Sequence, residues 1–397
     1  NYCLACWACK ENQEGVFLKL PHLFLSIFFL KLAQFILALT NPYDYYELDE
    51  TVIVYVILEL ATILIFFIVS YKLRPIEVSR VEARRSLKSL KQLYIVPAFL
   101  FFLIMFYYKI TLNLSLQQLR DLFYFGTDFI IGFGSINYLI FIYTALGYIL
   151  LYSGIILKDQ KAVLVALGSM LLFDVAQGGR MSFYYAFFLL WSIYFVSDSS
   201  KFLFKIKWSR AKYAVLVSYF VVITLGIITV SRMSSGEGMD LFEFLYVYLI
   251  GPIYLFSEAV KASDTAFAMD GRIGASFMSL DWAIVGVLKF YYTSLETLYA
   301  TLDGILATGY YFNNSYGMNA HFTSNFFLYV EYGYLGVLFF PVLLVGISRL
   351  RMPLANFLIY LLVFSYFISV REHFINSPIF IIALLLYPLF VKKVKYV

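Results

Sequence analysis

Apolar segments of roughly 20 residues recur along nearly the whole chain, and short polar segments separate them. These segments lack the alternation of apolar and polar residues that marks the strands of a membrane barrel. A bilayer offers no hydrogen-bond partners, so a segment that crosses it must satisfy its own backbone, which an α-helix does. The pattern therefore predicts an all-α polytopic integral membrane protein.

The order of the segments divides the chain into three parts. Residues 1–230 are expected to hold seven transmembrane helices, residues 231–325 one large external loop, and residues 326–397 the C-terminal transmembrane helices. Ten spans result, or twelve if two apolar parts of the loop cross the membrane as a pair. The seven N-terminal helices are expected near residues 20–39, 52–71, 92–108, 129–157, 162–174, 181–196 and 213–230.

Clusters of Lys and Arg set the expected orientation, because such clusters stay on the cytoplasmic side of a membrane. The segments 72–91 and 201–212 and the residues 392–395 are rich in Lys and Arg, whereas the segment 41–50 is acidic and has neither. We therefore expect the N- and C-termini in the cytoplasm and residues 41–50 outside.

The stretch 231–325 is the one long segment between spans that is neither a short turn nor a basic loop. It carries four Lys or Arg and nine Asp or Glu, the opposite balance to the cytoplasmic segments, which favours an outer location. Its apolar parts, residues 241–260 and 282–302, are expected to lie along the membrane interface or to enter the membrane and return.

Composition excludes a soluble globular protein. The 397 residues are 62% hydrophobic and 14% charged, whereas soluble domains are nearer half apolar and a quarter charged. The net charge of +5 is accounted for by the cytoplasmic segments, so it predicts no nucleic-acid partner.

Cys3, Cys6 and Cys9 are similar to part of an iron–sulfur ligand set but lack the fourth ligand, and neither a metal nor a cofactor is expected. HExxH, GxSxG and P-loop motifs do not occur, so zinc protease, serine hydrolase and nucleotide triphosphatase functions find no support.

Arginines on the predicted outer side are candidates for ligand binding, because they run against the positive-inside bias. Arg180, Arg232 and Arg371 lie where a span ends, and a guanidinium there can bind a phosphate through two hydrogen bonds. This arrangement suits a lipid pyrophosphate. The alternative is that each arginine reaches anionic lipid headgroups or pairs with a nearby carboxylate. The outer arginines are Arg120, Arg180, Arg232, Arg272 and Arg371.

Two further sets of side chains complete the candidate site. Arg371, Glu372 and His373 combine a fixed cation, a carboxylate and an imidazole, which can orient a sugar hydroxyl or take its proton. His321 is a second candidate base, and the alternative for both histidines is simple surface placement. Aromatic rings of the outer stretch suit the faces of sugars, although an aromatic belt at the membrane interface explains most of them. The candidates for substrate binding are Arg272, Tyr248, Tyr311 and Glu372.

Short motifs stand at the ends of the expected spans and in the outer stretch: Asn41-Pro42, Gly178-Gly179-Arg180, Ser231-Arg232, Tyr248-Leu249-Ile250-Gly251-Pro252, Tyr329-Val330-Glu331-Tyr332-Gly333-Tyr334-Leu335-Gly336 and Val370-Arg371. On these motifs the chain resembles the oligosaccharide repeat unit polymerases, the O-antigen polymerase (Wzy-type) family of bacterial envelope assembly. The likeness covers nearly the whole chain apart from residues 1–15. It implies a polytopic, metal-independent glycosyltransferase in the bacterial cytoplasmic (inner) membrane that uses no nucleotide sugar.

The resemblance also implies a reaction. The enzyme would join undecaprenyl-pyrophosphate-linked repeat units into a surface polysaccharide on the outer side of the membrane. Arg180, Arg232 and Arg371 are then expected to stabilise the leaving pyrophosphate, and His321 or His373 to take a proton from the acceptor hydroxyl. The expected partners are polyprenyl-pyrophosphate-linked glycans, membrane lipids, a chain-length regulator and a flippase.

Two other functions stay open at this point. An O-antigen ligase would share the lipid donor and the outer loop but would transfer the glycan to a lipid core. A flippase or other transporter of lipid-linked oligosaccharides would line a central path with polar residues. In this chain the ionisable residues cluster at the span ends, and the main exceptions are Lys31, Glu59 and Asp174.

Overall fold

The computed structural model of the protein describes residues 19–45, 47–73, 81–115, 118–119, 133–176, 185, 188–192, 195, 241–261, 280–289, 291–294, 323–350, 352–370 and 373–393. Within these ranges, five helical segments are long and apolar enough to cross a membrane: Leu20–Thr40, Glu50–Lys72, Arg85–Thr111, Leu139–Ile156 and Ser324–Ile347. The prediction of an all-α membrane protein is confirmed at this level. The count of ten to twelve spans includes residues outside these ranges and stays a prediction.

The elements follow one another along the chain as helices with two short strands. The α-helices are α2 (Leu20–Thr40), α3 (Glu50–Lys72), α4 (Arg85–Leu93), α5 (Ile95–Thr111), α7 (Phe133–Ile156), α8 (Gln160–Ala176), α12 (Leu241–Lys261), α13 (Leu280–Leu288), α15 (Ser324–Tyr332), α16 (Phe339–Ile347), α17 (Pro353–Ile368) and α18 (Pro378–Phe390). The 3-10 helices are η2 (Gly333–Leu338) and η3 (Phe374–Asn376), and the strands are β1 (Val81–Ala83) and β2 (Val391–Lys393).

Helix ends were predicted closely where a capping residue coincides with the end of an apolar segment. The helix expected at residues 52–71 is α3, which begins after Asp49, whose carboxylate accepts a hydrogen bond from the Thr51 N–H at 2.8 Å. The helix expected at residues 20–39 is α2, which ends before Asn41, a residue that adopts the left-handed conformation with φ of 39°.

The apolar part at residues 282–302 does not form one continuous helix. α13 is nine residues long, and it is followed by turns at residues 289 and 291–294. A helix of this length spans about 14 Å, well short of the roughly 30 Å hydrocarbon core, so α13 by itself cannot cross a membrane.

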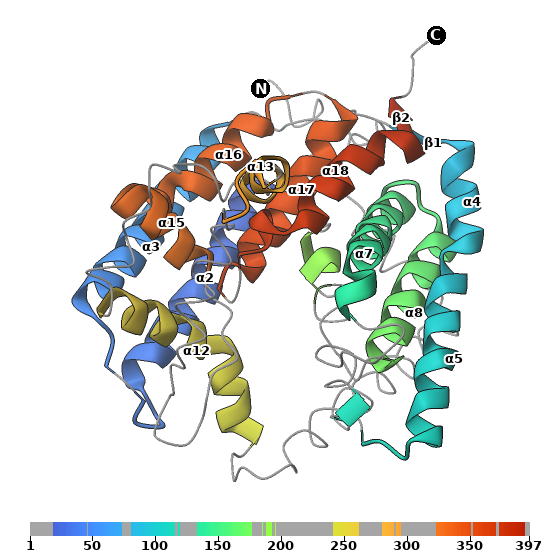
Figure 1. The fold of residues 1–397 in the computed structure, drawn as a ribbon. Coiled ribbons are helices and arrows are strands. Elements are labelled where there is room, and N and C mark those ends of the chain that lie inside the picture. The colour runs from blue at the N-terminus through green and yellow to red at the C-terminus, as the bar shows by residue number, and fades with distance from the viewer. Residues whose placement is uncertain are drawn as a thin grey trace, which may run out of the picture.

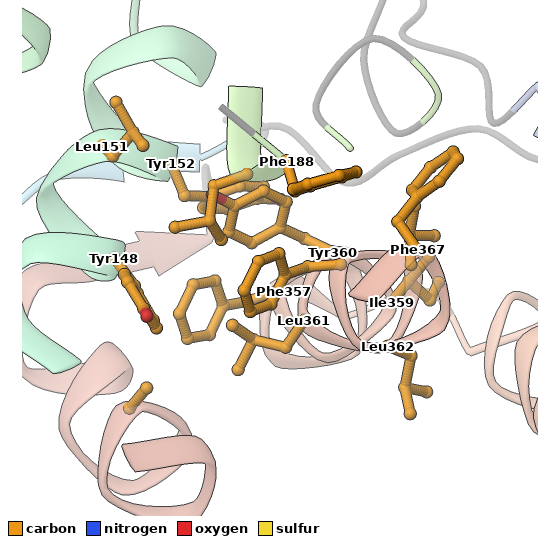
Figure 2. Packing of buried hydrophobic residues seen from close by; sticks show 14 of the residues in the cluster. Tyr148, Leu151, Tyr152, Phe188, Phe357, Ile359, Tyr360, Leu361, Leu362 and Phe367 are labelled. Carbon is orange, nitrogen blue, oxygen red and sulfur yellow. The ribbon is translucent and has the colours of Figure 1, made fainter. Parts of the chain in front are cut away.

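α17 and α18 lie between two groups of helices (Figure 1). α2, α3, α12, α15 and α16 form one group, and α4, α5, α7 and α8 form the other. Nearly every side chain of α17 is buried, and aromatic rings join it to α7 and α18. Tyr152 of α7 packs on Tyr360 with ring centroids 4.7 Å apart (Figure 2), and Tyr387 of α18 stacks on Phe357 at 4.3 Å. This packing makes α17 the central helix of the described bundle.

Segments that the charge pattern assigns to one side of the membrane meet at one end of the bundle. β1 and β2 pair in antiparallel register, with Val81 opposite Lys393, and the Arg84 N–H donates to the Phe390 carbonyl at 2.9 Å. At the same end, Lys91 of α4 forms an ion pair with Asp159, which lies between α7 and α8. These contacts agree with the predicted topology, which requires the segments to share a side.

The Lys91–Asp159 pair predicts a pH-dependent contribution to stability. Partial burial raises the pKa of Asp159, but the hydrogen bond from Lys91 and the backbone N–H of Ala162 outweigh it, so the pKa lies below its usual value. The contribution is therefore present above the unfolded pKa of about 3.9 and is lost as the pH falls through the lowered folded value. We expect Asp159→Asn to lower the thermal midpoint at pH 7 and the difference to shrink below about pH 4. A difference that persists unchanged at pH 3 would contradict this origin.

At the other end of the bundle, α12 lies across the turn between α2 and α3 (Figure 1). Lys261 donates to the carbonyl of Glu47 at 2.8 Å, and the hydroxyl of Ser257 accepts the N–H of Asp49 at 2.6 Å. Pro252 lies inside α12, where it has no N–H to donate and so leaves the Tyr248 carbonyl without its donor from the helix. α12 is thus held at the end of the bundle where α2 ends and α3 begins.

Candidate functional site

α2 carries two buried polar side chains on one face. Lys31 and Gln34 are three residues apart, so they project from the same side of the helix. Lys31 is 2% exposed and Gln34 is 7% exposed, and the other buried side chains of α2 are apolar. We call these two residues the polar face of α2. Polar groups at this depth need partners, and the two residues bind different segments of the chain.

Lys31 forms a triad with Glu59 of α3 and Asn325 of α15. The Lys31 ammonium lies 2.7 Å from one carboxylate oxygen of Glu59, and the Asn325 amide donates to the other oxygen at 2.7 Å. The ammonium also donates to Asn325 Oδ1 at 3.4 Å and lies 5.6 Å from the ring centroid of Tyr366. The triad is neutral in sum, and it joins α2, α3 and α15 next to α17.

Gln34 joins two other segments through one nitrogen atom. Its Nε2 donates to the carbonyl of Leu249 in α12 at 2.8 Å and to the carbonyl of Val370, just beyond α17, at 2.9 Å. Leu249 follows Tyr248 and Val370 precedes Arg371, and both neighbours are candidate site residues. The polar face of α2 therefore brings together segments that lie far apart in the sequence.

α15 begins within the bundle, at residues that the sequence pattern assigned to the end of the outer stretch. Thr323, Ser324 and Asn325 are 1%, 0% and 6% exposed. The Thr323 hydroxyl caps the helix by accepting the Phe326 N–H at 3.2 Å, and the Ser324 N–H donates to the Ser369 carbonyl at 3.1 Å. The end of the outer stretch is therefore tied to the end of α17 as well as to Glu59.

His373 is the candidate catalytic residue that lies within the described part of the chain. Its ring stacks on Phe327 of α15, with centroids 4.6 Å apart and an interplanar angle of 16°. The side chain is 8% exposed, which excludes the alternative of simple surface placement. His373 follows Val370 by three residues, so it lies near the segment that Gln34 holds.

The other candidates lie in α12 or outside the described ranges. Tyr248 belongs to α12, where its backbone is described. Asp174 of α8, one of the three ionisable residues noted within the spans, is fully buried. The candidates outside the described ranges are Arg180, Arg232, Arg272, Tyr311, His321, Arg371 and Glu372.

Two tyrosines of α12 have structural contacts. The Tyr246 hydroxyl donates to the carbonyl of Leu37 at 2.9 Å, and the Tyr254 hydroxyl donates to the carbonyl of Ala38 at 2.7 Å. These carbonyls belong to the last turn of α2, and the Leu37 carbonyl also accepts from the Asn41 N–H and the Thr40 hydroxyl. Both rings are buried, so these two tyrosines hold α12 on α2 and are not free to line a sugar-binding surface.

Two tyrosines after α13 differ from those of α12. Tyr291 is 80% exposed and Tyr292 is 64% exposed. Amphipathic rings exposed in this way suit a membrane interface or the face of a sugar. Tyr291 and Tyr292 are therefore aromatic residues of the outer stretch that are exposed enough to belong to an interfacial belt or to a surface that binds substrate.

Sequence reasoning found Lys31 and Glu59 as ionisable residues within spans but did not pair them. It missed Gln34, although a polar residue three positions after Lys31 on an apolar helix is a usable signal. Asn325 gave no signal beyond its position at the end of the outer stretch, since an asparagine is common in loops.

No cofactor or metal site emerges from the described residues. Among them, no group of three or more His, Cys, Asp or Glu side chains could hold a metal ion. Comparison of the chain with models of protein families, with curated proteins and with solved structures finds no match. The assignment of function therefore depends on the residues and on their arrangement.

Proposed function

We propose that this protein is an oligosaccharide repeat unit polymerase, which moves a glycan from one polyprenyl-pyrophosphate carrier to a hydroxyl group of a second lipid-linked glycan. The bond between the sugar C1 and the pyrophosphate oxygen breaks, and a bond from C1 to the acceptor oxygen forms. The acceptor proton passes to a base, for which His373 or His321 is proposed, and the carrier leaves as polyprenyl pyrophosphate. Arg180, Arg232 and Arg371 are proposed to stabilise the charge that develops on the leaving group.

The observation that carries the proposal is the meeting of three of the motifs on which the resemblance rests. Gln34 joins Leu249, from the motif inside α12, to Val370, from the motif that ends in an arginine. The Tyr254 hydroxyl of α12 is 3.2 Å from Oδ1 of Asn41, the first residue of a third motif. A reaction between two large lipid-linked substrates needs groups from separate segments in a fixed arrangement, so this convergence supports a site beside α12.

The proposal predicts polymer formation by the purified protein. In liposomes with synthetic undecaprenyl-pyrophosphate-linked repeat units, the wild type should yield a ladder of chain lengths on a gel without added nucleotide or metal. Arg371→Ala should lower the rate about 100- to 1,000-fold, because one donor to the developing charge is lost. Arg180→Ala should have an effect of the same order.

Arg349→Ala is the matched control, because this exposed arginine follows α16 and forms with Arg351 a basic pair of the kind that is expected on the cytoplasmic side. Its ladder should equal that of the wild type. Unchanged ladders in the Arg371→Ala and Arg180→Ala proteins would overturn the proposal. Transfer to an added lipid core acceptor without polymer would instead assign the protein as a ligase.

A further inference from the structure

Gln34 uses both hydrogens of one amide nitrogen to join two segments of the chain. Nε2 donates to the Leu249 carbonyl at 2.8 Å and to the Val370 carbonyl at 2.9 Å, and the side chain is 7% exposed. An amide of this kind has two N–H donors on that nitrogen, and here each has its own acceptor. The contact spans 215 residues to Leu249 and 336 residues to Val370.

The two carbonyls differ in where they lie. Val370 lies two residues beyond the last residue of α17, so its carbonyl is outside the hydrogen-bond ladder of that helix. Leu249 lies inside α12 next to Tyr248, whose carbonyl has no helical donor because Pro252 lacks an N–H. Gln34 thus donates to one carbonyl beyond a helix end and to one beside a break in a helical ladder.

We infer that Gln34 is a positioning residue of the proposed site, where it fixes the backbone that carries Tyr248 against the backbone that carries Arg371. This inference rests on the proposed function. In the sequence, Tyr248 directly precedes Leu249 and Arg371 directly follows Val370, the two residues whose carbonyls Gln34 holds. A guanidinium stabilises a developing charge only when its position is fixed before the reaction, and displacement by about 1 Å lowers the rate strongly.

The kinetic test compares Gln34→Met in two backgrounds. Methionine keeps the length of the side chain and removes both donors. In the wild type, we expect Gln34→Met to lower the turnover number about 10- to 100-fold and to leave KM for the lipid-linked donor nearly unchanged. In an Arg371→Lys background the same substitution should have an effect of less than about twofold, since the paired donors of the guanidinium are already lost.

Equal effects of Gln34→Met in the two backgrounds would overturn the inference, because Gln34 would then act independently of Arg371. Thr40→Val is the matched control on α2, since the exposed Thr40 hydroxyl donates only to Leu37 of its own helix in the described residues. This control should leave both kinetic constants unchanged. If Gln34→Met does not fold, Gln34→Asn replaces it, since the shorter amide cannot reach both carbonyls.

A cross-linking test measures whether Gln34 holds the two segments together, and it needs no activity assay. The variant carries Leu249→Cys and Val370→Cys, and Cys3, Cys6 and Cys9 are replaced by Ser. These substitutions keep both backbone carbonyls. A short bifunctional thiol reagent should join the two introduced cysteines. Gln34→Met should lower the cross-linked fraction by about half or more, and an unchanged fraction would overturn the inference.

The two tests separate the inference from the proposed function. If the cross-link depends on Gln34 but the protein makes no polymer, the proposed function is overturned. The joining of the two segments by Gln34 is then still established. If the protein makes polymer, but Gln34→Met leaves the cross-linked fraction unchanged and has the same kinetic effect in both backgrounds, only the positioning role of Gln34 is overturned.

Discussion

Replacing Lys31 by methionine is expected to destabilise the protein by about 3–5 kcal/mol. The substitution leaves the Glu59 carboxylate, which is 4% exposed, without the ammonium that lies 2.7 Å away. The charge would be held in an apolar interior, where screening by salt and water is weak. The free energy of unfolding in detergent micelles, followed by circular dichroism as denaturant is added, measures the loss.

A second variant separates the buried charge from the lost contacts. Lys31→Met/Glu59→Gln should recover most of the loss, because glutamine carries no charge and keeps an acceptor for the Asn325 amide. Lys261→Met is the matched control, since it removes a partly exposed ion pair with Glu258 and an exposed hydrogen bond to the Glu47 carbonyl, and it should cost less than about 1 kcal/mol. If Lys31→Met cost no more than this control, the triad would not be a buried charge pair.

The Gly336→Ala variant is expected to lose about 1–3 kcal/mol of stability through overpacking. A Cβ atom at Gly336 would lie 2.5 Å from the carbonyl oxygen of Leu328 and 2.9 Å from the hydroxyl oxygen of Tyr55. The first of these atoms belongs to the backbone of α15, which is tied to the bundle at its first turn, so it cannot move away at low cost. Unfolding in micelles again measures the effect.

Gly346→Ala provides a control of opposite sign in the same segment. Gly346 lies in α16, and a Cβ atom there would meet nothing within 4 Å. Alanine in place of glycine inside a helix is expected to stabilise the protein by about 0.5–1 kcal/mol. Equal effects of the two substitutions would mean that η2 does not pack closely against α3 and α15.

The apolar pattern predicted the class of fold and the bounds of α2 and α3, because a bilayer makes length and hydrophobicity decisive for a spanning helix. It could not divide the apolar part 282–302, since periodicity does not reveal where a helix of nine residues ends in a turn. It placed Asn325 at the last position of the outer stretch and gave no sign that this side chain is bonded to Glu59.

The candidate site was predictable only in part, because its key contacts join residues hundreds of positions apart. Lys31 and Glu59 were visible as charges within spans, yet their pairing depends on how α2 and α3 pack. The bridge from Gln34 to Leu249 and Val370 has no counterpart in local sequence pattern. The predicted roles of the outer arginines lie beyond the described residues and stay predictions.

The pairing of β1 with β2 has a consequence for the biosynthesis of this protein. The neighbouring hydrogen bond from the Ser86 hydroxyl to the Leu389 carbonyl joins residues 303 positions apart. Translation proceeds from the N-terminus, so most of the chain is synthesised after residues 81–86 and before the residues that pair with them. Until then the early helices are held by membrane insertion and by nearby contacts, such as the packing of α2 on α3. The strand pair thus closes the bundle as a late step of assembly.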